Sequence, residues 1–414
     1  MKKIGILGAG VTGLSAARFL MKDFDVEVLE KKDVCGGIAR TRDVDGLAYH
    51  TVGGHCFNSK YPEIMDFVFN EVLPREQWNK IKRVSKIAIA GNEFLYPIEF
   101  SCKDIFKCNP NLGISIASDF LSSIDDNNYE NLADWFEKKF GKTLANLYFI
   151  PYNQKIWGMN PKDIDPSWVI DKLPIPDKYT FFEALTSDKE DDMPHAYFYY
   201  PKTNNQNTFL DALAHGVNIK YNEDVKNICY DSKKRKWIVN DVLEYDILIN
   251  TTPLDLLPAK ITNAPDIVKD AAKKLKYNKI SNVFWRSLPT TKTWTYLPES
   301  NSLFHRYIHI GSYFQPSQGY SISESIGEYT YEELVENGKN DSFLLEPLAY
   351  NQSEHAYVVY DHNYKYAVPC ILDYLSSIGL HSIGRFGEWQ YYNMDVCMKR
   401  SEDLAKRLKS EHAA

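Results

Sequence analysis

The stretch KKIGILGAGVTGLSAARFL, residues 2–20, indicates the fold class of this chain. Its apolar run Ile4–Leu7 is typical of a buried parallel strand, and a helical pattern begins directly after it. The residues between the two are Gly8, Ala9, Gly10, Val11, Thr12 and Gly13. In a dinucleotide-binding turn, the first glycine makes the turn, the second admits a pyrophosphate, and the third lets helix pack on strand. We therefore predict a strand–turn–helix unit that binds a dinucleotide through these residues.

The next strand carries the acidic residue that such a unit needs. An apolar run, Val26–Leu29, ends in Glu30. A carboxylate at this position binds a ribose diol, and the N-terminus of the preceding helix directs partial positive charge at the phosphates. A glycine-rich turn without a ligand is the alternative interpretation. The order of strand, glycine turn, helix, strand and acid favours the dinucleotide.

A second glycine pair follows in KKDVCGGIARTR, residues 31–42. Gly36-Gly37 with Ala39-Arg40 resembles the second signature of flavoproteins that contain two dinucleotide-binding domains. The resemblance implies a tightly held FAD rather than an exchanging NAD, with Gly37 against the pyrophosphate and Arg40 near it. Lys31, Ile38 and Ala39 complete the cofactor contacts expected here. A solvated loop is the alternative interpretation for Arg40 and Arg42.

Composition excludes several other classes of protein. The chain has 414 residues, 44% hydrophobic and 25% charged, which are globular values and suggest two or three domains. A net charge of −7 offers no basic field for nucleic acid or an anionic membrane. No apolar run reaches the ~18 residues of a membrane span. The seven cysteines are scattered, and the N-terminus has no signal-peptide flanks, so we expect a cytoplasmic protein. The histidines form no HxxxH motif, so we expect no metal site.

Further motifs follow along the chain. Paired glycines in TVGGHCF, residues 51–57, allow the backbone to approach a flat ring, which His55 would then contact; a purely structural histidine is the alternative. RVSKIAIAGNEFLYPIEF, residues 83–100, predicts two strands joined by a turn at residues 90–93. The other segments are LYFIPYNQKIWG (147–158), TYLPESNSLFHRYIHIGSY (295–313) and GRFGEWQYYNMD (384–395).

Taken in order, these segments resemble the UDP-galactopyranose mutase family, particularly its eukaryotic-type branch. The resemblance implies an isomerase that interconverts the pyranose and furanose forms of a nucleotide sugar of the UDP-galactose type. It further implies FAD that is active when reduced, and an adduct between the sugar and the flavin N5. An external reductant such as NAD(P)H and a homodimer stay open.

The expected fold class is α/β, with a discontinuous Rossmann-like FAD-binding domain, a helical insertion and an antiparallel β-sheet substrate domain. The FAD-binding domain is expected at residues 1–80, 205–260 and 375–414, the helical domain at 101–185, and the sheet domain at 81–100, 186–204 and 261–374. Residues 131–150 place apolar side chains at helical spacing, which we interpret as core. The buried run 247–250 predicts a strand that returns to the nucleotide sheet, and 394–409 a closing amphipathic helix.

The resemblance assigns a role to each motif. Besides the residues named above, the cofactor contacts that it implies are Gly53, Gly54, His55, Ser85, Val225, Thr251, Arg385, Asn393 and Met394. The implied substrate contacts are Tyr96, Glu99, Asn153, Trp157, Lys172, Tyr296, Arg306, Tyr313, Tyr366 and Tyr391. His55, Arg306 and Lys172 are the expected catalytic residues.

Arginine suits a diphosphate clamp because its planar fork bonds two phosphate oxygens at once, which makes Arg306 the first choice. In a regular strand, positions 306 and 313 face opposite sides, so a bend must intervene for Tyr313 to reach the site. Lys172 stands where the family has a second arginine and supplies a charge without the fork. Glu99 replaces a glutamine and adds negative charge, and residues 202–207 replace a glycine-rich segment. Tyr391 and Asn393 also stand closer together than in the eukaryotic members.

Two rivals share the FAD signatures. One is an oxidoreductase of the amine oxidase or protoporphyrinogen oxidase type, which needs an apolar substrate tunnel. The other is a binding protein similar to the GDP dissociation inhibitors, which hold no flavin and would be colourless. The intact Gly36–Arg40 and Gly384–Trp389 segments favour a flavin-binding enzyme.

Overall fold

The computed structural model describes residues 1–123, 128–170, 173, 175, 177–186 and 196–412. A parallel five-stranded sheet has the order β19-β13-β1-β2-β9. Its strands are β1 (Lys3–Leu7), β2 (Asp25–Leu29), β9 (Ile219–Lys220), β13 (Ile247–Asn250) and β19 (Leu380–Ser382). The predicted return of residues 247–250 is confirmed, since Ile4 pairs with Ile247 and Leu7 with Asn250. Segments far apart in the chain therefore build one Rossmann-like sheet.

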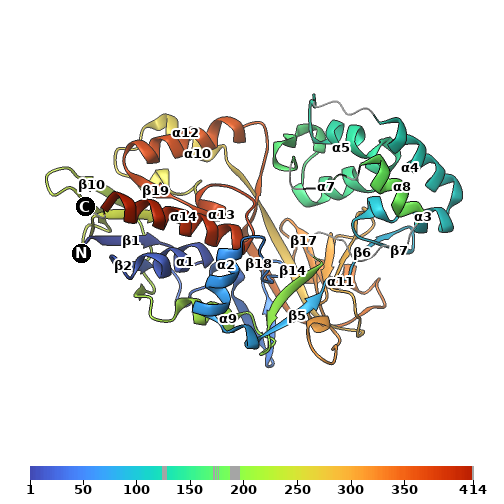
Figure 1. Cartoon of the computed structure of the whole chain (residues 1–414), viewed down its shortest axis with the longest axis horizontal. Helices are drawn as coiled ribbons and strands as arrows, with labels where there is room; N and C mark the ends of the chain where they lie inside the picture. The colour runs from blue at the N-terminus through green and yellow to red at the C-terminus, as the bar shows by residue number, and fades with distance from the viewer. Residues whose placement is uncertain (124–127, 171–172, 174, 176, 187–195, 413–414) are drawn as a thin grey trace.

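Helices cover this sheet. Helix α1 (Val11–Leu20) packs against α14 (Met394–His412), beside which both chain ends lie, and near α9 (Asn207–Ala214) (Figure 1). Ala16 and Ala17 of α1 are fully buried, and their small side chains let neighbouring elements approach closely. The Ser401 hydroxyl donates to the Thr12 carbonyl at 2.9 Å and ties α14 to the start of α1. The closing helix predicted for 394–409 thus completes the dinucleotide-binding unit.

A second, mostly antiparallel sheet has seven strands in the order β18-β14-β17-β16-β15-β6-β7. They are β6 (Ser85–Ile89), β7 (Asn92–Leu95), β14 (Lys276–Ser287), β15 (Trp294–Tyr296), β16 (Arg306–Ile308), β17 (Tyr320–Ile326) and β18 (Leu344–Val359). The predicted turn between β6 and β7 is confirmed at Ala90 and Gly91, whose φ values are 50° and 75°, but residues 92 and 93 already belong to β7. This sheet brings strands from residues 85–95 beside strands from residues 276–359.

A helical part lies beside β6 and β7, at the right of Figure 1. It contains α3 (Cys102–Cys108), α4 (Pro110–Ser122), α5 (Leu132–Phe140), α6 (Lys142–Leu144), α7 (Ile150–Trp157) and α8 (Lys178–Thr186). Helix α5 begins where the Asn131 side chain accepts a hydrogen bond from the Asp134 amide. The aromatic residues predicted as core are buried; Phe140 stacks on Phe149 with ring centroids 4.1 Å apart.

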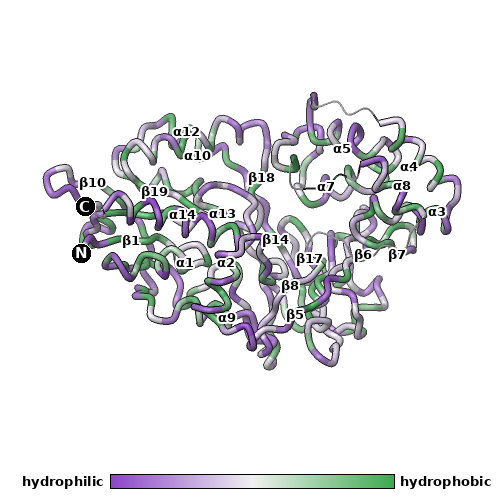
Figure 2. The backbone as a smooth tube through the Cα atoms, in the orientation of Figure 1, coloured by the Kyte–Doolittle hydropathy of each residue, from purple (hydrophilic) through white to green (hydrophobic). Residues whose placement is uncertain are grey.

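Smaller elements link these layers. The strands are β3 (Thr41–Val44), β4 (Leu47–His50), β5 (Trp78–Lys82), β8 (Tyr197–Pro201), β10 (Ile228–Asp231), β11 (Lys236–Val239) and β12 (Leu243–Tyr245); the helices are α2 (Pro62–Asp66), α10 (Asp266–Lys273), α11 (Tyr331–Gly338), α12 (Tyr364–Ser377) and α13 (Gly384–Gly387). Figure 2 shows short hydrophobic segments (green) interrupted by hydrophilic ones, and no described helix is long and apolar enough to cross a membrane.

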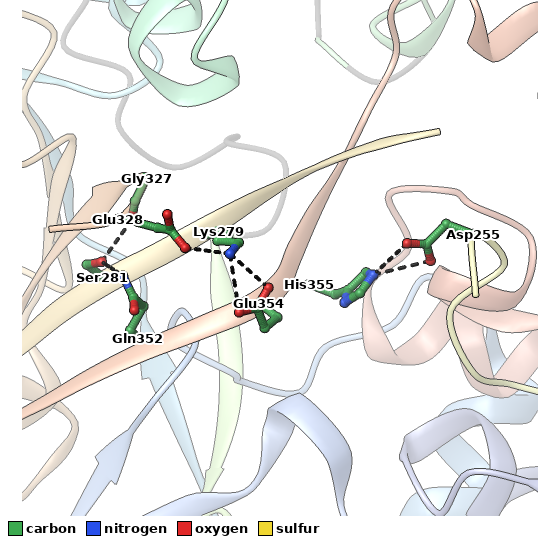
Figure 3. A network of polar contacts seen from close by, with 8 residues as sticks. All are labelled: Asp255, Lys279, Ser281, Gly327, Glu328, Gln352, Glu354 and His355. Carbon is green, nitrogen blue, oxygen red and sulfur yellow. Dashed lines mark hydrogen bonds and ion pairs between the residues drawn. The ribbon is translucent and has the colours of Figure 1, made fainter. Parts of the chain in front are cut away.

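Strand β18 connects the two sheets. Near its end, His355 contacts Asp255 in the loop after β13, with Nε2 3.0 Å from Oδ2 (Figure 3). On β14, Lys279 forms ion pairs with both Glu328 and Glu354 (Figure 3). The His355 ring also stacks on Tyr277 with centroids 3.8 Å apart. The His355–Asp255 contact thus ties strand β18 of the second sheet to the loop that follows β13 of the first sheet.

Candidate active site

The first glycine turn has the close packing that its sequence predicts. Gly8 has a φ of +95°, which favours glycine, and a Cβ on Gly13 would lie only 1.9 Å from the Gly8 carbonyl oxygen. Gly10 differs, because its backbone is extended and the nearest atom to an added Cβ is 4.0 Å away. The turn therefore requires Gly8 and Gly13 for its own structure and leaves open space at Gly10.

The second glycine pair completes the same surface. The Gly36 amide donates to the Ala9 carbonyl at 2.8 Å, and Gly10 forms an isolated bridge with Gly36. Gly37, with a φ of +58°, faces Gly10, since an added Cβ would lie 3.2 Å from the Gly10 Cα. The two loops form a backbone cradle in which side chains would obstruct a pyrophosphate.

The predicted acid lies at the edge of this cradle. Buried Glu30 accepts hydrogen bonds from the Ala9 amide at 2.8 Å and from the Lys32 amide at 3.0 Å. Arg40 instead pairs with Asp211 of α9, so its guanidinium is not simply solvated. Lys31 is exposed and Ile38 half-buried, while Ala39 is buried. Two backbone amides thus hold the Glu30 carboxylate against the first glycine turn, and Arg40 braces the second loop.

The C-terminal segment approaches from the other side. Gly384 has a φ of +88°, and a Cβ there would lie 2.3 Å from the Thr12 hydroxyl oxygen. Its amide donates to the buried Glu388 carboxylate at 2.9 Å. The Arg385 Nη2 donates to the Ala356 carbonyl at 2.7 Å. Residues 384–388 therefore bring the predicted arginine next to the start of α1.

Three buried polar atoms near these loops have no hydrogen-bond partner in the described part of the chain: His55 Nε2, Gln206 Oε1 and Arg385 Nε. Buried polar groups are normally satisfied, so their geometry fits a dinucleotide that carries donors and acceptors. Gln206 contacts Met394 at the start of α14, with Asn393 directly before it. The Thr251 hydroxyl donates to the Leu7 carbonyl at 2.7 Å under the first turn. Val225 is buried.

Arg306 lies where the loop of residues 51–55, which carries Gly53 and His55, meets the second sheet. Its Nε donates to Glu324 at 2.8 Å, and its Nη2 donates to the Tyr357 hydroxyl at 2.8 Å. Gly53 has a φ of +61°, and a Cβ there would lie 3.1 Å from the Arg306 Nη2. The predicted clamp arginine and the predicted glycine–histidine loop are therefore in contact.

Aromatic rings surround the two guanidinium groups of Arg306 and Arg385. The Arg385 guanidinium lies 4.6 Å from the ring centroid of Tyr391 and 5.4 Å from that of Tyr357. Tyr357 stacks on Tyr391 with centroids 5.6 Å apart. Cations and phenol rings at these distances attract each other, so Tyr357 joins the two arginines into one cluster.

Tyr296 and Tyr96 extend this cluster. Their ring centroids are 5.0 Å apart, and Tyr152 approaches Tyr296 at 5.6 Å. Arg83 donates to the Tyr296 hydroxyl at 3.0 Å and to the Ser85 hydroxyl at 3.1 Å, which places Ser85 in the same wall. Burial, outweighing a smaller opposing influence of nearby Arg306, raises the pKa of Tyr152 well above its usual value, so this phenol stays a neutral donor.

The conflict between positions 306 and 313 is resolved by a bend. A short 3-10 helix, Ile310–Tyr313, follows β16 and redirects the chain. Tyr313 is fully buried between aromatic rings, and its hydroxyl lies 3.5 Å from the position of a Cβ on Gly54. Tyr313 therefore packs beside the glycine loop at Gly54.

Asn153 and Trp157 form a pair on α7. The indole Nε1 of Trp157 donates to the Asn153 side chain at 3.0 Å, and both residues are buried. Trp157 meets Tyr357 edge-on, with centroids 6.5 Å apart. The helical part thus contributes to the same cluster.

Two expectations about substrate contacts need correction. Tyr366 is 49% exposed on α12 and lies beside Lys274, because Ala367, Val368 and Ile371 form the buried side of that helix. Glu99 is only 3% exposed, and burial raises its pKa to about 8. A mainly neutral carboxyl at neutral pH replaces the expected negative charge. Lys172 lies outside the described residues.

His55 has a definite protonation state. Burial, assisted by the positive charge of Arg385, lowers the pKa of His55 to about 4. The imidazole is therefore neutral at physiological pH and serves as a hydrogen-bonding group rather than as a cation. In the described residues, no three His, Cys, Asp or Glu side chains are grouped as they would be to hold a metal.

Sequence reasoning missed Tyr357 and Arg83. Arg83 begins the quoted segment 83–100, so its position in a motif was the available signal. Tyr357 lies in the long strand β18, where nothing in the local pattern distinguishes it from the other tyrosines of the chain.

The glycine cradle defines a protein with a Rossmann-like dinucleotide-binding domain, and a cationic, tyrosine-lined cluster lies on the adjoining antiparallel sheet. Residues 6–70 match the model of the NAD(P)-binding Rossmann-like domain. A Klebsiella pneumoniae protein named "Probable UDP-galactopyranose mutase" is 28% identical over 203 residues, 47% of this chain and 50% of the relative. A dTDP-fucopyranose mutase of Escherichia coli is 26% identical over 201 residues, 45% of this chain and 52% of the relative. The matches thus span about half the length of these curated relatives.

The fold comparison covers the whole chain. A solved structure of reduced UDP-galactopyranose mutase superposes with a TM-score of 0.85 at 22% identity, over 100% of this chain and 95% of the other. The resemblance to UDP-galactopyranose mutases that the motifs indicated is confirmed, and so is the predicted α/β fold with its Rossmann-like and antiparallel sheets.

Proposed function

We propose that this protein is an FAD-dependent mutase that interconverts the pyranose and furanose forms of a nucleotide sugar. The observation that carries the proposal is the contact between Arg306 and Gly53, where an added Cβ would lie 3.1 Å from the guanidinium. A residue suited to grip a diphosphate thus borders the loop that ends the dinucleotide cradle. The mutases similar in sequence support the same activity.

The residues present fit FAD. The cradle at Gly10 and Gly37 would hold its pyrophosphate, Glu30 its ribose, and the 51–55 loop its ring. The buried Nε atom of Arg385 and the Nε2 atom of His55 would find partners on the isoalloxazine. When bound and reduced, FAD would supply the nucleophilic nitrogen for the anomeric carbon of the sugar.

The chain itself would hold the departing diphosphate. Arg306 and the phenols of Tyr296, Tyr357 and Tyr391, which belong to one cluster, would donate hydrogen bonds to the phosphate oxygens. A diphosphate that stays bound returns to the sugar in an effectively intramolecular step. Neutral His55 supplies a hydrogen bond to the ring region rather than a proton.

The charge of the cluster argues against an apolar substrate. Arg83 and Arg385 donate only to hydroxyl, phenol and carbonyl oxygens, and in the described ranges neither forms an ion pair. Half-buried cations without carboxylates favour an anionic ligand. An amine offers no such group, so the amine oxidase alternative is disfavoured.

An anaerobic screen tests the proposal. Dithionite-reduced protein is incubated with UDP-galactopyranose, UDP-galactofuranose and dTDP-fucopyranose, and the products are separated by chromatography. We expect ring interconversion of at least one sugar without net oxidation. A colourless protein, or peroxide release with an amine or porphyrinogen in air and no isomerisation, would contradict it.

A further inference from the structure

Glu324 is a buried carboxylate that contacts both halves of the proposed site. It lies on β17 with no solvent exposure, and its Oε2 accepts from the Gly53 amide at 2.8 Å. Its Oε1 accepts from the Arg306 Nε at 2.8 Å, and His305 Nε2 lies 3.2 Å from the same oxygen. One carboxylate thus holds the glycine loop with one oxygen and the arginine with the other.

The strand register produces this arrangement. Arg306 on β16 stands directly opposite Glu324 on β17 in the antiparallel ladder. Side chains of such a cross-strand pair lie on the same face of the sheet and within reach of each other. Gly53 comes from a distant segment and meets the pair through its backbone amide alone.

Glu324 remains ionised. Burial by itself would raise its pKa, but the positive charge of Arg306 and the His305 hydrogen bond outweigh burial and lower the pKa to about 2. A buried carboxylate is costly unless its hydrogen bonds are satisfied, and here both oxygens are engaged. This arrangement persists across the whole physiological pH range.

The carboxylate also decides which part of Arg306 is available. A guanidinium has five N–H donors in a rigid fork. Nε and Nη2 are engaged by Glu324 and Tyr357, whereas Nη1 has no partner among the residues described. Glu324 therefore binds the guanidinium through Nε and Nη2 and leaves the Nη1 amino group to bind an anion.

We propose that Glu324 is a positioning residue that sets the Arg306 clamp and the Gly53 loop at a fixed separation, and hence the diphosphate relative to the flavin. The identity of these two ligands rests on the proposed function. The physical basis is that two groups bonded to opposite oxygens of one immobile carboxylate cannot move independently. Arg306 aims the diphosphate and Gly53 lies beside the ring, so their separation governs alignment of the reacting atoms.

The test uses the FAD-loaded protein and three variants. E324Q keeps the shape but removes the charge, and E324D keeps the charge but shortens the reach by one methylene. E27Q is the matched control, since Glu27 is a buried, ion-paired glutamate on β2 with Tyr245, Lys3 and Lys220 as partners. Readouts are the Kd of inorganic pyrophosphate and of UDP by calorimetry, the visible spectrum of the bound flavin, kcat and KM, and the thermal midpoint.

We expect E324Q and E324D to weaken binding of both anions at least about tenfold, to shift the flavin band, and to lower kcat more than they raise KM. E27Q should lower only the thermal midpoint. A Glu324 variant that unfolds earlier but retains the wild-type Kd, spectrum and kcat would overturn the proposal, because a merely structural glutamate predicts that result. If E324Q does not fold, E324D decides by the same criteria.

The two hypotheses can fail separately. Absence of isomerisation by the wild type would contradict the proposed function, yet anion binding and the flavin spectrum would still report whether Glu324 couples the clamp to the loop. A variant that weakens anion binding without any spectral change would overturn the coupling while leaving the proposed function intact.

Discussion

The hydroxyl of Tyr357 accepts a hydrogen bond from Nη2 of Arg306 at 2.8 Å, and Nη2 and Nε of the same guanidinium both contact Oε1 of Glu324. Two of the three guanidinium nitrogens of Arg306 are thus engaged in hydrogen bonds, and Tyr357 helps to fix the orientation of this cation. The same ring stacks on Tyr391, so the clamp and the C-terminal segment share one aromatic contact.

Removing this hydroxyl should weaken the clamp. We expect Y357F to lower kcat/KM by about 10- to 100-fold, because a hydrogen bond to a charged group contributes about 1.5–3 kcal/mol. Y366F is the matched control: Tyr366 is half-exposed beside Lys274, so steady-state kinetics should be unchanged. Equal losses in the two variants would contradict the placement of Tyr357 in the site.

We expect alanine substitutions at Gly10 and Gly13 to have different effects. G10A should leave the apo chain folded, since its backbone is extended and the nearest atom is 4.0 Å from the new Cβ. The methyl group would instead occupy the ligand's space, so we expect at least about tenfold weaker flavin retention. G13A should destabilise the fold, because its Cβ would overlap the Gly8 carbonyl oxygen.

Urea unfolding of the apo proteins and flavin absorbance after gel filtration separate these effects. A G10A protein that keeps its flavin as tightly as the wild type would show that no pyrophosphate lies over Gly10.

Buried Glu99 should make stability fall as pH rises. Burial raises its pKa from 4.5 to about 8, so between these values the unfolded chain releases a proton that the folded chain keeps. Unfolding free energy therefore decreases from pH 4.5 to pH 8. We expect the unfolding free energy of E99Q to exceed that of the wild type by about 2 kcal/mol at pH 8 and to equal it at pH 4.5. The full pKa shift corresponds to about 5 kcal/mol, which is the upper limit for this difference.

Denaturant titrations at the two pH values measure this difference. An E99Q gain that is the same at pH 4.5 and pH 8 would indicate a packing effect rather than a proton effect.

His55 should act in the opposite direction. Its pKa is lowered by burial and by Arg385 from 6.5 to about 4, so between these values the unfolded chain binds a proton that the folded chain excludes. Stability is therefore lost as pH falls from 6.5 to 4. Between pH 6.5 and pH 4, we expect the unfolding free energy of H55Q to fall by about 2 kcal/mol less than that of the wild type.

Thermal midpoints at pH 4.5 and pH 7 provide the measurement, and proton NMR of the imidazole should show no titration between pH 5.5 and 8. A His55 resonance that titrates near 6.5 would contradict the buried, neutral ring.

The sequence alone determined the Rossmann-like unit. Its signals are local: an apolar strand, a turn in which Gly8 and Gly13 admit nothing larger, and an acid at the next strand end. Motif order then pointed to Arg306, Tyr296 and Tyr391, which the structure brings together around one cluster.

Only the tertiary structure decided which tyrosine joins Arg306 and what charge Glu99 carries. Tyr357 and Tyr366 look alike in sequence, but the phase of α12 against its core turns Tyr366 outward, while β18 carries Tyr357 to the clamp. The neutral carboxyl of Glu99 comes from burial, and the Glu324 contacts come from a strand register and a distant loop. Long-range packing sets each of these, because the neighbours that fix a side chain's environment are remote in the chain.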